Sequence, residues 1–117
     1  MGFVCVILES PFANADKFLF DRNRRYLELA MLDCLKRGEA PFASHKMYTQ
    51  CLDDNIPEQR ELGIQAGFAW RSMAHKTVVY EDLGISRGME YGIAHAKEIG
   101  HVIEYRGIPE WSAEKAP

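Results

Sequence analysis

The sequence predicts a single α/β domain: a Rossmann-like (flavodoxin-like) parallel sheet of about four to five strands with helices on both faces. Of its 117 residues, 47% are hydrophobic, which is enough for one core. Short apolar runs alternate with segments in which apolar residues recur every three or four positions. The resulting order β-α-β-α-β-α-β is typical of a parallel sheet covered by its crossover helices. We expect this domain to span residues 1–106, followed by an irregular tail over residues 107–117.

The first strand is predicted over Phe3–Leu8. Its apolar run is too short for a buried helix and is typical of a strand buried on both faces. Pro11 lacks a backbone donor and ends the strand, and residues 13–20 are expected to connect it to a helix over Asp21–Arg37. Apolar residues form one stripe along that helix, and Gly38 is well placed to follow its last turn.

The second strand is predicted as a weak one over Ala40–Ser44. Pro41 indicates that it is short or lies at a sheet edge. Residues 45–56 are expected to form a polar connection. The third and fourth strands are predicted over Lys76–Tyr80 and Val102–Tyr105.

Two further helices are expected between these strands. Pro57 suits the first turn of a helix that runs to about Ala74. Its apolar stripe is predicted to be Leu62, Ala66, Ala69, Trp70 and Met73. Gly63 and Gly67 each cost this helix about 1 kcal/mol relative to alanine, which indicates a close approach of another element. The last helix is capped by Ser86, carries Met89, Ile93 and Ala96 inward, and ends at Gly100.

The charge pattern argues against binding of a nucleic-acid polymer. The net charge is −3, and polymer binding needs a clustered basic face. The one basic cluster, Arg22, Arg24 and Arg25, lies among acidic residues and is predicted to be a solvated helix face.

The cysteines and the hydropathy pattern indicate a cytoplasmic protein. Cys5, Cys34 and Cys51 are odd in number and lack Cys-x-x-Cys spacing, which argues against disulfides and zinc. Cys5 and Cys34 lie in apolar patterns and are predicted to be core residues. No secretory leader and no run long enough to cross a bilayer is present, so we expect no membrane association. Nothing in the sequence calls for a cofactor or a metal.

The segment Asp82–Ala94 carries the strongest functional signal. It places a glycine-rich turn and a carboxylate at the carboxyl end of the third strand, where open α/β sheets bind ligands. With Ser86 as N-cap, Glu90 ends the first helical turn, whose partial positive charge favours its ionised form. Such a carboxylate can attack an electrophilic carbon. Asp82 is a second candidate, for acid–base work or hydroxyl recognition. An exposed glutamate and a turn-forming aspartate are the plainer alternatives.

Several loops at the same sheet edge supply candidate ligand-binding residues. These are Gly84, Ser86, Arg87, Gly88 and Met89 in the turn, Ser10, Pro11 and Phe12 after the first strand, and His45 after the second. The Ser86 hydroxyl and the free helix N–H groups can hold a phosphate. A rigid exit turn and a structural histidine are the alternatives for the other two loops. The sequence lacks the glycine motifs of dinucleotide-binding Rossmann folds and of P-loops.

The element Gly88-Met89-Glu90-Tyr91-Gly92-Ile93-Ala94 resembles the Gly-Met-Glu-φ-Gly-Tyr-Ala element of nucleoside 2-deoxyribosyltransferases, where φ is apolar. The chain also resembles small, often phage-encoded relatives of that family. The further matching segments are Ser10-Pro11-Phe12, Pro41-Phe42-Ala43-Ser44-His45, Leu52-Asp53-Asp54 with Glu58-Gln59-Arg60, and Gly84-Ile85-Ser86-Arg87-Gly88-Met89. The match covers roughly residues 3–106.

This resemblance implies 2-deoxyribosyl transfer or hydrolysis at the N-glycosidic bond of a deoxynucleoside or its 5′-monophosphate. Glu90 would be the nucleophile that attacks C1′. The resemblance also implies a homo-oligomer, because neighbouring subunits often complete such sites.

The chain departs from the family pattern in two places. The family's aspartate on the helix before the third strand falls near Gly67, and the helix from Pro57 to Ala74 contains no aspartate. The turn from Asp82 to Glu90 is about two residues longer than in the transferases. A nucleotide-binding or sensing protein without catalysis, and a structural protein that keeps the fold, therefore remain alternatives.

Overall fold

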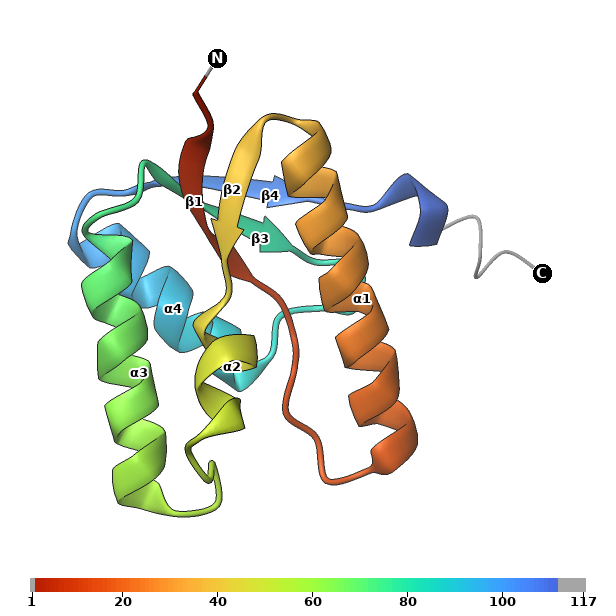
Figure 1. The fold of residues 1–117 in the computed structure, drawn as a ribbon, viewed down its shortest axis with the longest axis vertical. Coiled ribbons are helices and arrows are strands. Elements are labelled where there is room, and N and C mark those ends of the chain that lie inside the picture. Colours follow the sequence, from red (N-terminus) through yellow and green to blue (C-terminus); the bar gives the residue numbers. More distant parts are fainter. Residues whose placement is uncertain (1, 112–117) are drawn as a thin grey trace.

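The computed structural model describes residues 2–111 and contains a four-stranded, all-parallel sheet in the order β2-β1-β3-β4 (Figure 1). The strands are β1 (Val4–Glu9), β2 (Glu39–Phe42), β3 (Lys76–Tyr80) and β4 (Val102–Arg106). The helices are α1 (Lys17–Lys36), α2 (Ser44–Met47), the 3-10 helix η1 (Tyr48–Gln50), α3 (Pro57–Arg71) and α4 (Arg87–Glu98). The predicted α/β class with a parallel sheet is confirmed.

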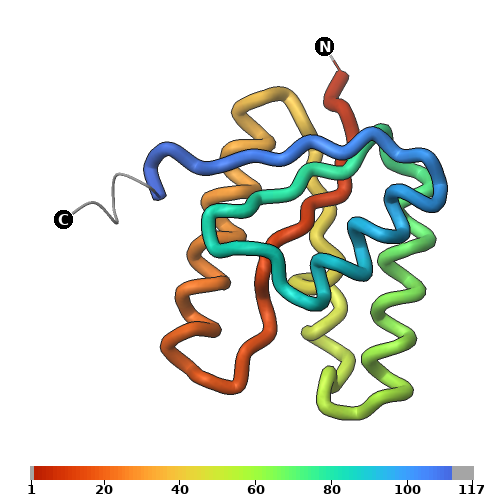
Figure 2. The backbone as a smooth tube through the Cα atoms, turned by 180° about the vertical axis from the view of Figure 1, so that it is seen from behind, coloured from red at the N-terminus to blue at the C-terminus, as the bar shows by residue number. Residues whose placement is uncertain are grey.

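Helices cover both faces of the sheet, as expected (Figures 1 and 2). Because side chains alternate along a strand, β3 contributes to two cores, one on each face of the sheet. One core joins the sheet to α1 and comprises Val6, Leu8, Tyr26, Leu27, Ala30, Cys34, Val78 and Tyr80, among others. The other joins the opposite face to α4 through Val79, Met89 and Ile93. The predicted inward stripe of α4 is confirmed, and Cys34 is a core residue.

Helix α1 begins earlier than the sequence predicted. It starts at Lys17 rather than Asp21, because Asp16 caps it by accepting a hydrogen bond at Oδ1 from the Leu19 N–H. Residues 17–20, which were expected to belong to the connection, therefore form the first turn of the helix. At the other end Gly38 has φ +79°, the left-handed conformation that favours glycine after a last turn.

The second strand and the connection that follows it also differ from the prediction. Strand β2 covers Glu39–Phe42 and lies at the sheet edge, where Pro41 costs no hydrogen bond. The stretch expected to be a polar connection over residues 45–56 contains α2 and η1. Helix α2 forms because the Ala43 carbonyl accepts from the N–H groups of Lys46 and Met47.

Cys5 is exposed, so its predicted place in the core is wrong. Strand β1 begins before β3, because Lys76, the first residue of β3, pairs with Val6. Burial on both faces therefore starts at Val6 rather than at the beginning of the apolar run.

The predicted apolar stripe of α3 is also wrong. Leu62, Trp70 and Met73 are 63%, 47% and 77% exposed. Helix α3 buries Gly67 and Arg71 instead. The close approach predicted at Gly67 is confirmed, because a Cβ there would lie 2.6 Å from the Oγ of Ser44 on α2.

The C-terminal segment is partly ordered against the domain. Trp111 is 3% exposed, and its ring centroid lies 5.0 Å from that of Tyr26 on α1. Residues 109–111 are helical, so the irregular tail predicted from residue 107 is wrong for this stretch. The rest of the predicted tail lies outside the described residues. No helix within residues 2–111 is both long and apolar enough to cross a membrane.

Candidate functional site

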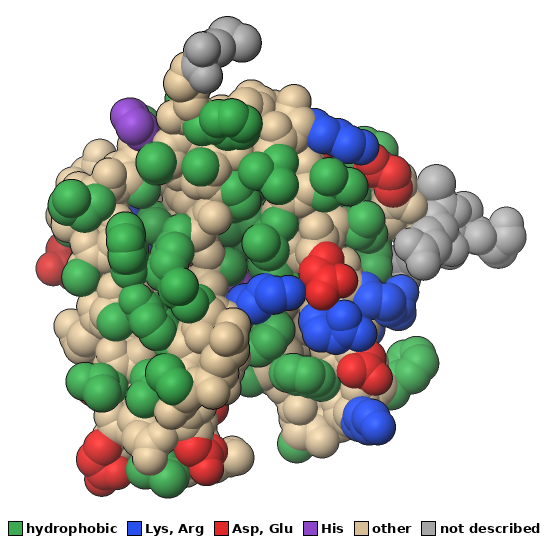
Figure 3. All heavy atoms as spheres, viewed as in Figure 1, with side chains coloured by type: hydrophobic (Ala, Val, Ile, Leu, Met, Phe, Trp, Pro, Cys, Tyr) green, Lys and Arg blue, Asp and Glu red, His purple; other side chains and the backbone are tan. Residues whose placement is uncertain are grey.

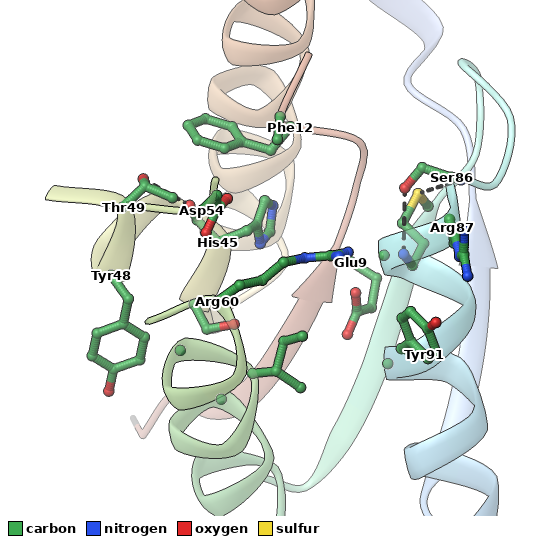
Figure 4. A pocket seen from close by; sticks show the side chains of 18 of the residues that line it. Glu9, Phe12, His45, Tyr48, Thr49, Asp54, Arg60, Ser86, Arg87 and Tyr91 are labelled. Atoms are coloured by element: carbon green, nitrogen blue, oxygen red, sulfur yellow. Dashed lines mark hydrogen bonds between the residues drawn. The ribbon is translucent and has the colours of Figure 1, made fainter. Parts of the chain in front are cut away.

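A cavity of about 340 Å³ lies at the carboxyl end of β1. Its walls come from the end of β1, the β1–α1 loop, α2, η1, α3 and the first turns of α4 (Figure 4). The chain continues from β1 to β2 on one side and reaches β3 on the other, so the strand order reverses at this point. Open α/β sheets bind ligands in the crevice at such a reversal.

The carboxyl group of Glu9 lies in this cavity. Its side chain is 13% exposed and forms an ion pair with Nη2 of Arg71. Burial raises the pKa of Glu9, while the charge of Arg71 opposes that rise. Gly92 of α4 leaves the space that this carboxyl group occupies.

Arg71 is held on three sides, which fixes the position of Glu9. Its Nε donates to Nδ1 of His95 at 3.1 Å, and its Nη1 donates to Oγ1 of Thr77 at 2.7 Å. His95 in turn stacks on Phe68 with ring centroids 3.9 Å apart. Desolvation and the neighbouring charge of Arg71 lower the pKa of His95, which keeps Nδ1 available as an acceptor.

A second polar pair, Ser10 and His45, lines the cavity next to Glu9. Ser10 Oγ and His45 Nε2 are hydrogen-bonded at 3.2 Å. Burial lowers the pKa of His45 to about 4, so the imidazole is neutral at pH 7. The ring of Phe12 packs against His45 edge to face, with centroids 5.6 Å apart.

Two arginines give the cavity a positive character. Arg60 extends into it from the start of α3, and Arg87 lies across from it at the start of α4 (Figure 4). Ser86 caps α4, and its Oγ accepts from the Met89 N–H at 3.3 Å. Guanidinium groups and a helix N-terminus both favour anions such as phosphate.

Aromatic side chains supply apolar contact surface around the same space: Phe12, Tyr48, Phe68 and Tyr91. Aromatic rings offer flat faces on which a base can stack. The cavity can therefore hold an anionic ligand with an aromatic group against a fixed carboxyl group.

The structure brings most of the sequence-predicted binding residues to this cavity. Its lining includes Ser10, Phe12, His45, Ser86, Arg87, Gly88 and Met89. Pro11 and Gly84 do not belong to the lining, and Gly84 shapes the turn before α4 with φ +86°.

Glu90 lies in the first turn of α4 after the Ser86 cap, as predicted, but its side chain does not line the cavity. It is exposed, whereas Tyr91 and Gly92 line the cavity. Helix α4 turns Met89 toward the sheet, and the 100° step to the next residue carries Glu90 past both the sheet and the cavity. The expected contact of Glu90 with a ligand stays a prediction, and within a single chain Glu90 does not line this cavity.

The Asp82 carboxylate is hydrogen-bonded within the fold. Its Oδ2 accepts from the Tyr26 hydroxyl at 2.8 Å and from the Ile108 N–H at 2.7 Å. It links the β3–α4 turn to α1 and the C-terminal segment, and it does not line the cavity.

Sequence reasoning missed Glu9, Arg60 and Arg71. A carboxylate that directly follows a buried strand was the available signal for Glu9. Arg71 has no comparable signal, because an arginine at the end of an amphipathic helix is usually solvated. The part of the chain that the structure describes contains no group of three His, Cys, Asp or Glu side chains able to hold a metal ion.

The fold and the site define an α/β protein with a Rossmann-like sheet and a candidate ligand cavity at its strand-order reversal. Residues 4–106 match a family described as Domain of unknown function (DUF7768), and the chain belongs to that family. Comparison with curated proteins gave no match, and neither did comparison with solved structures.

Proposed function

We propose that the protein acts on the N-glycosidic bond of a nucleoside or nucleotide, by hydrolysis or by 2-deoxyribosyl transfer. The observation that carries this proposal is the buried, fixed carboxyl group of Glu9 in a cavity lined by arginines and aromatic rings. The resemblance to nucleoside 2-deoxyribosyltransferases suggests the reaction class. The cavity geometry favours Glu9 over Glu90 as the reacting carboxylate.

The proposed chemistry proceeds in two steps, as in retaining glycosidases. A Glu9 oxygen bonds to C1′ while the bond from C1′ to the base nitrogen breaks, and the base takes a proton from solvent. Water or a second base then attacks C1′, which breaks the ester and restores the carboxylate. Burial raises the pKa of Glu9, and the positive charge of Arg71 opposes that rise in favour of the ionised carboxylate that the first step needs.

The remaining side chains support binding of the substrate. Arg60, Arg87 and the N-terminus of α4 suit a phosphate group, and Tyr48 and Phe68 suit the base. Neutral His45 and Ser10 can hydrogen-bond to sugar hydroxyls.

The test is release of free base from a panel of deoxynucleosides and their 5′-monophosphates, followed by chromatography. Glu9→Gln should lower the rate at least about 100-fold. The matched variant Glu90→Gln should stay within about twofold of the parent, because Glu90 is exposed outside the cavity. Loss with Glu90→Gln alone would return the nucleophile role to Glu90. Base release from no compound would refute the reaction.

A nucleotide-binding or sensing protein is the second candidate. The observation that favours it is the tight pairing of Glu9 with Arg71, since buried ion pairs are often structural. A large thermal shift with nucleotides, without turnover, would select this function.

We further propose a cytoplasmic homo-oligomer. Helix α3 exposes Leu62 and Trp70, the turn after it exposes Met73, and Figure 3 shows hydrophobic side chains gathered over the face that carries α3 and β2. Contiguous exposed apolar surface often marks an interface. Light scattering should give a mass of two or more chains, and Trp70→Lys should lower it. A monomeric parent protein would contradict the proposal.

A further inference from the structure

A second groove adjoins the cavity. It has a volume of about 680 Å³ and shares Phe12, Thr49, Leu52 and Asp54 with the cavity lining. It lies between the β1–α1 loop and the connection from η1 to α3. Figure 3 shows the molecule hollowed between these two segments, at its lower edge. The two spaces therefore lie side by side.

The groove differs from the cavity in its chemistry. None of the described residues that line it is a lysine or an arginine, whereas the cavity holds Arg60 and Arg87. The groove alone carries the Asp53 carboxylate and the amides of Asn14 and Asn55, and it shares the Asp54 carboxylate with the cavity. Its apolar wall is the edge-to-face pair of Phe12 and Phe20, with ring centroids 5.1 Å apart.

The boundary between the two spaces lies at the start of α3. Gln59 lines the groove and the next residue, Arg60, lines the cavity. A ligand that spans both spaces could therefore reach the Arg60 guanidinium, which extends into the cavity from the start of α3 (Figure 4). Guanidinium groups bind phosphate and pyrophosphate oxygens in pairs.

We infer that the groove is a subsite for the second nucleoside of a dinucleotide substrate. The nucleoside to be cleaved lies over Glu9, the pyrophosphate lies near Arg60, and the second nucleoside occupies the groove. Carboxylates accept hydrogen bonds from ribose hydroxyls, amides pair with base edges, and the phenylalanine wall contacts the base. This inference rests on the proposed function and names its substrate class.

The dimensions and charges favour a dinucleotide over other nucleotides. A cavity of about 340 Å³ lies near the lower limit for small-molecule sites, so it suits one nucleoside. A mononucleoside ligand would therefore leave the groove empty. A nucleic-acid strand would place further phosphates beside Asp53 and Asp54, where the described lining offers no cation. Single-strand grooves normally follow the backbone with positive charge.

The experiment compares NAD with nicotinamide mononucleotide, which share the same scissile bond. In either compound the C1′–nitrogen bond breaks and neutral nicotinamide leaves. Water supplies the hydroxyl at C1′ and releases a proton. Nicotinamide is measured by chromatography. We expect kcat/KM for NAD to exceed that for the mononucleotide by about tenfold or more.

Two groove variants make the comparison specific. Ala15 lies in an exposed loop that lines the groove alone, so Ala15→Trp fills the groove with little effect on folding. It should lower kcat/KM for NAD about tenfold and leave the mononucleotide within about twofold. Asn55→Ala should raise KM for NAD without changing kcat. Glu61→Gln, on α3 outside both spaces, is the matched control and should change neither substrate.

The outcomes separate this inference from the proposed function. Equal rates for both substrates, unchanged by Ala15→Trp, would overturn the subsite and leave N-glycosidic chemistry intact. Cleavage of neither compound would count against the reaction, and calorimetry then decides the subsite. The subsite is supported if NAD binds more tightly than the mononucleotide and Ala15→Trp abolishes this difference. The subsite is overturned if NAD and the mononucleotide bind equally well or do not bind. It is also overturned if a single-stranded oligonucleotide binds more strongly than NAD.

Discussion

Gly92→Ala tests the central contact of the site, the packing of α4 against Glu9. A Cβ at Gly92 would lie 2.5 Å from Cδ and 2.8 Å from Oε1 of Glu9, with Oε2 closer still. Well-packed interiors do not accommodate such distances without movement. The carboxyl group must shift, yet Arg71 holds it in place.

The expected effect is a loss of stability of about 2 kcal/mol or more. Alanine gains about 1 kcal/mol over glycine in a helix interior. Overpacking costs about 1–3 kcal/mol. Breaking a buried ion pair by displacing one partner adds up to about 3–5 kcal/mol. The unfavourable contributions exceed the gain in helix propensity, so the sign is destabilising.

Urea unfolding followed by circular dichroism measures this difference. Gly88→Ala on the same helix is the control, because a Cβ there meets nothing within 4 Å, and it should be neutral or stabilising by up to about 1 kcal/mol. In a Glu9→Ala background the obstacle to Gly92→Ala is gone, so that substitution should become neutral or stabilising. The reasoning is refuted if Gly92→Ala is as stable as Gly88→Ala, or if its cost is the same in both backgrounds.

Three further predictions concern the face of the sheet covered by α1 and the cap of α4. Arg106 and Lys76 lower the pKa of Glu39 to about 2, so the stability this carboxylate contributes is present above pH 4.5 and is lost as the pH falls toward 2. This contribution is on the order of 3 kcal/mol. Urea titrations at several pH values should show a smaller dependence of stability on pH in Glu39→Gln than in the parent protein. Ser86→Ala removes the acceptor of the Met89 N–H and should cost about 1 kcal/mol in the same assay. Thiol labelling of the native protein should modify exposed Cys5 and Cys51 quickly, whereas Cys34 should react only after unfolding, since burial raises its thiol pKa to about 11. Fast modification of Cys34 would contradict its place in the core.

The fold was predictable because its elements carry strong local signals. Apolar runs mark β1 and β3, and Gly38 and Gly100 end their helices with φ +79° and +72°. Parallel topology then follows from the alternation of strands and helices. The start of α1 was not predictable from hydrophobicity, because it depends on one side-chain cap at Asp16.

The orientation of α3 shows where hydrophobic periodicity fails. Its outward face carries Leu62 and Trp70, and its inward face carries Gly67 and the buried Arg71. A hydrophobic-stripe argument selects the apolar face as the inner one. Helix α3 instead buries a polar arginine, because Glu9, Thr77 and His95 satisfy its donors. Glu9 and His95 lie far from Arg71 in the sequence, and Thr77 lies on the next strand, so no pattern within the helix indicates these partners.

The Gly-Met-Glu element lies on the helix and at the edge of the sheet that border the cavity, but the carboxylate that lines the cavity is Glu9 rather than Glu90. Met89 packs on the sheet, Glu90 faces solvent, and Gly92 borders the cavity. Within this element the glycine is the residue that shapes the site, because a larger side chain would occupy the position of the Glu9 carboxyl group. Glu9, at the end of β1, thus supplies the carboxylate beside α4, whereas the sequence pattern predicted that this carboxylate would be Glu90 of α4 itself. Comparing Glu9→Gln with Glu90→Gln therefore asks which of two strand-edge positions supplies the reacting oxygen.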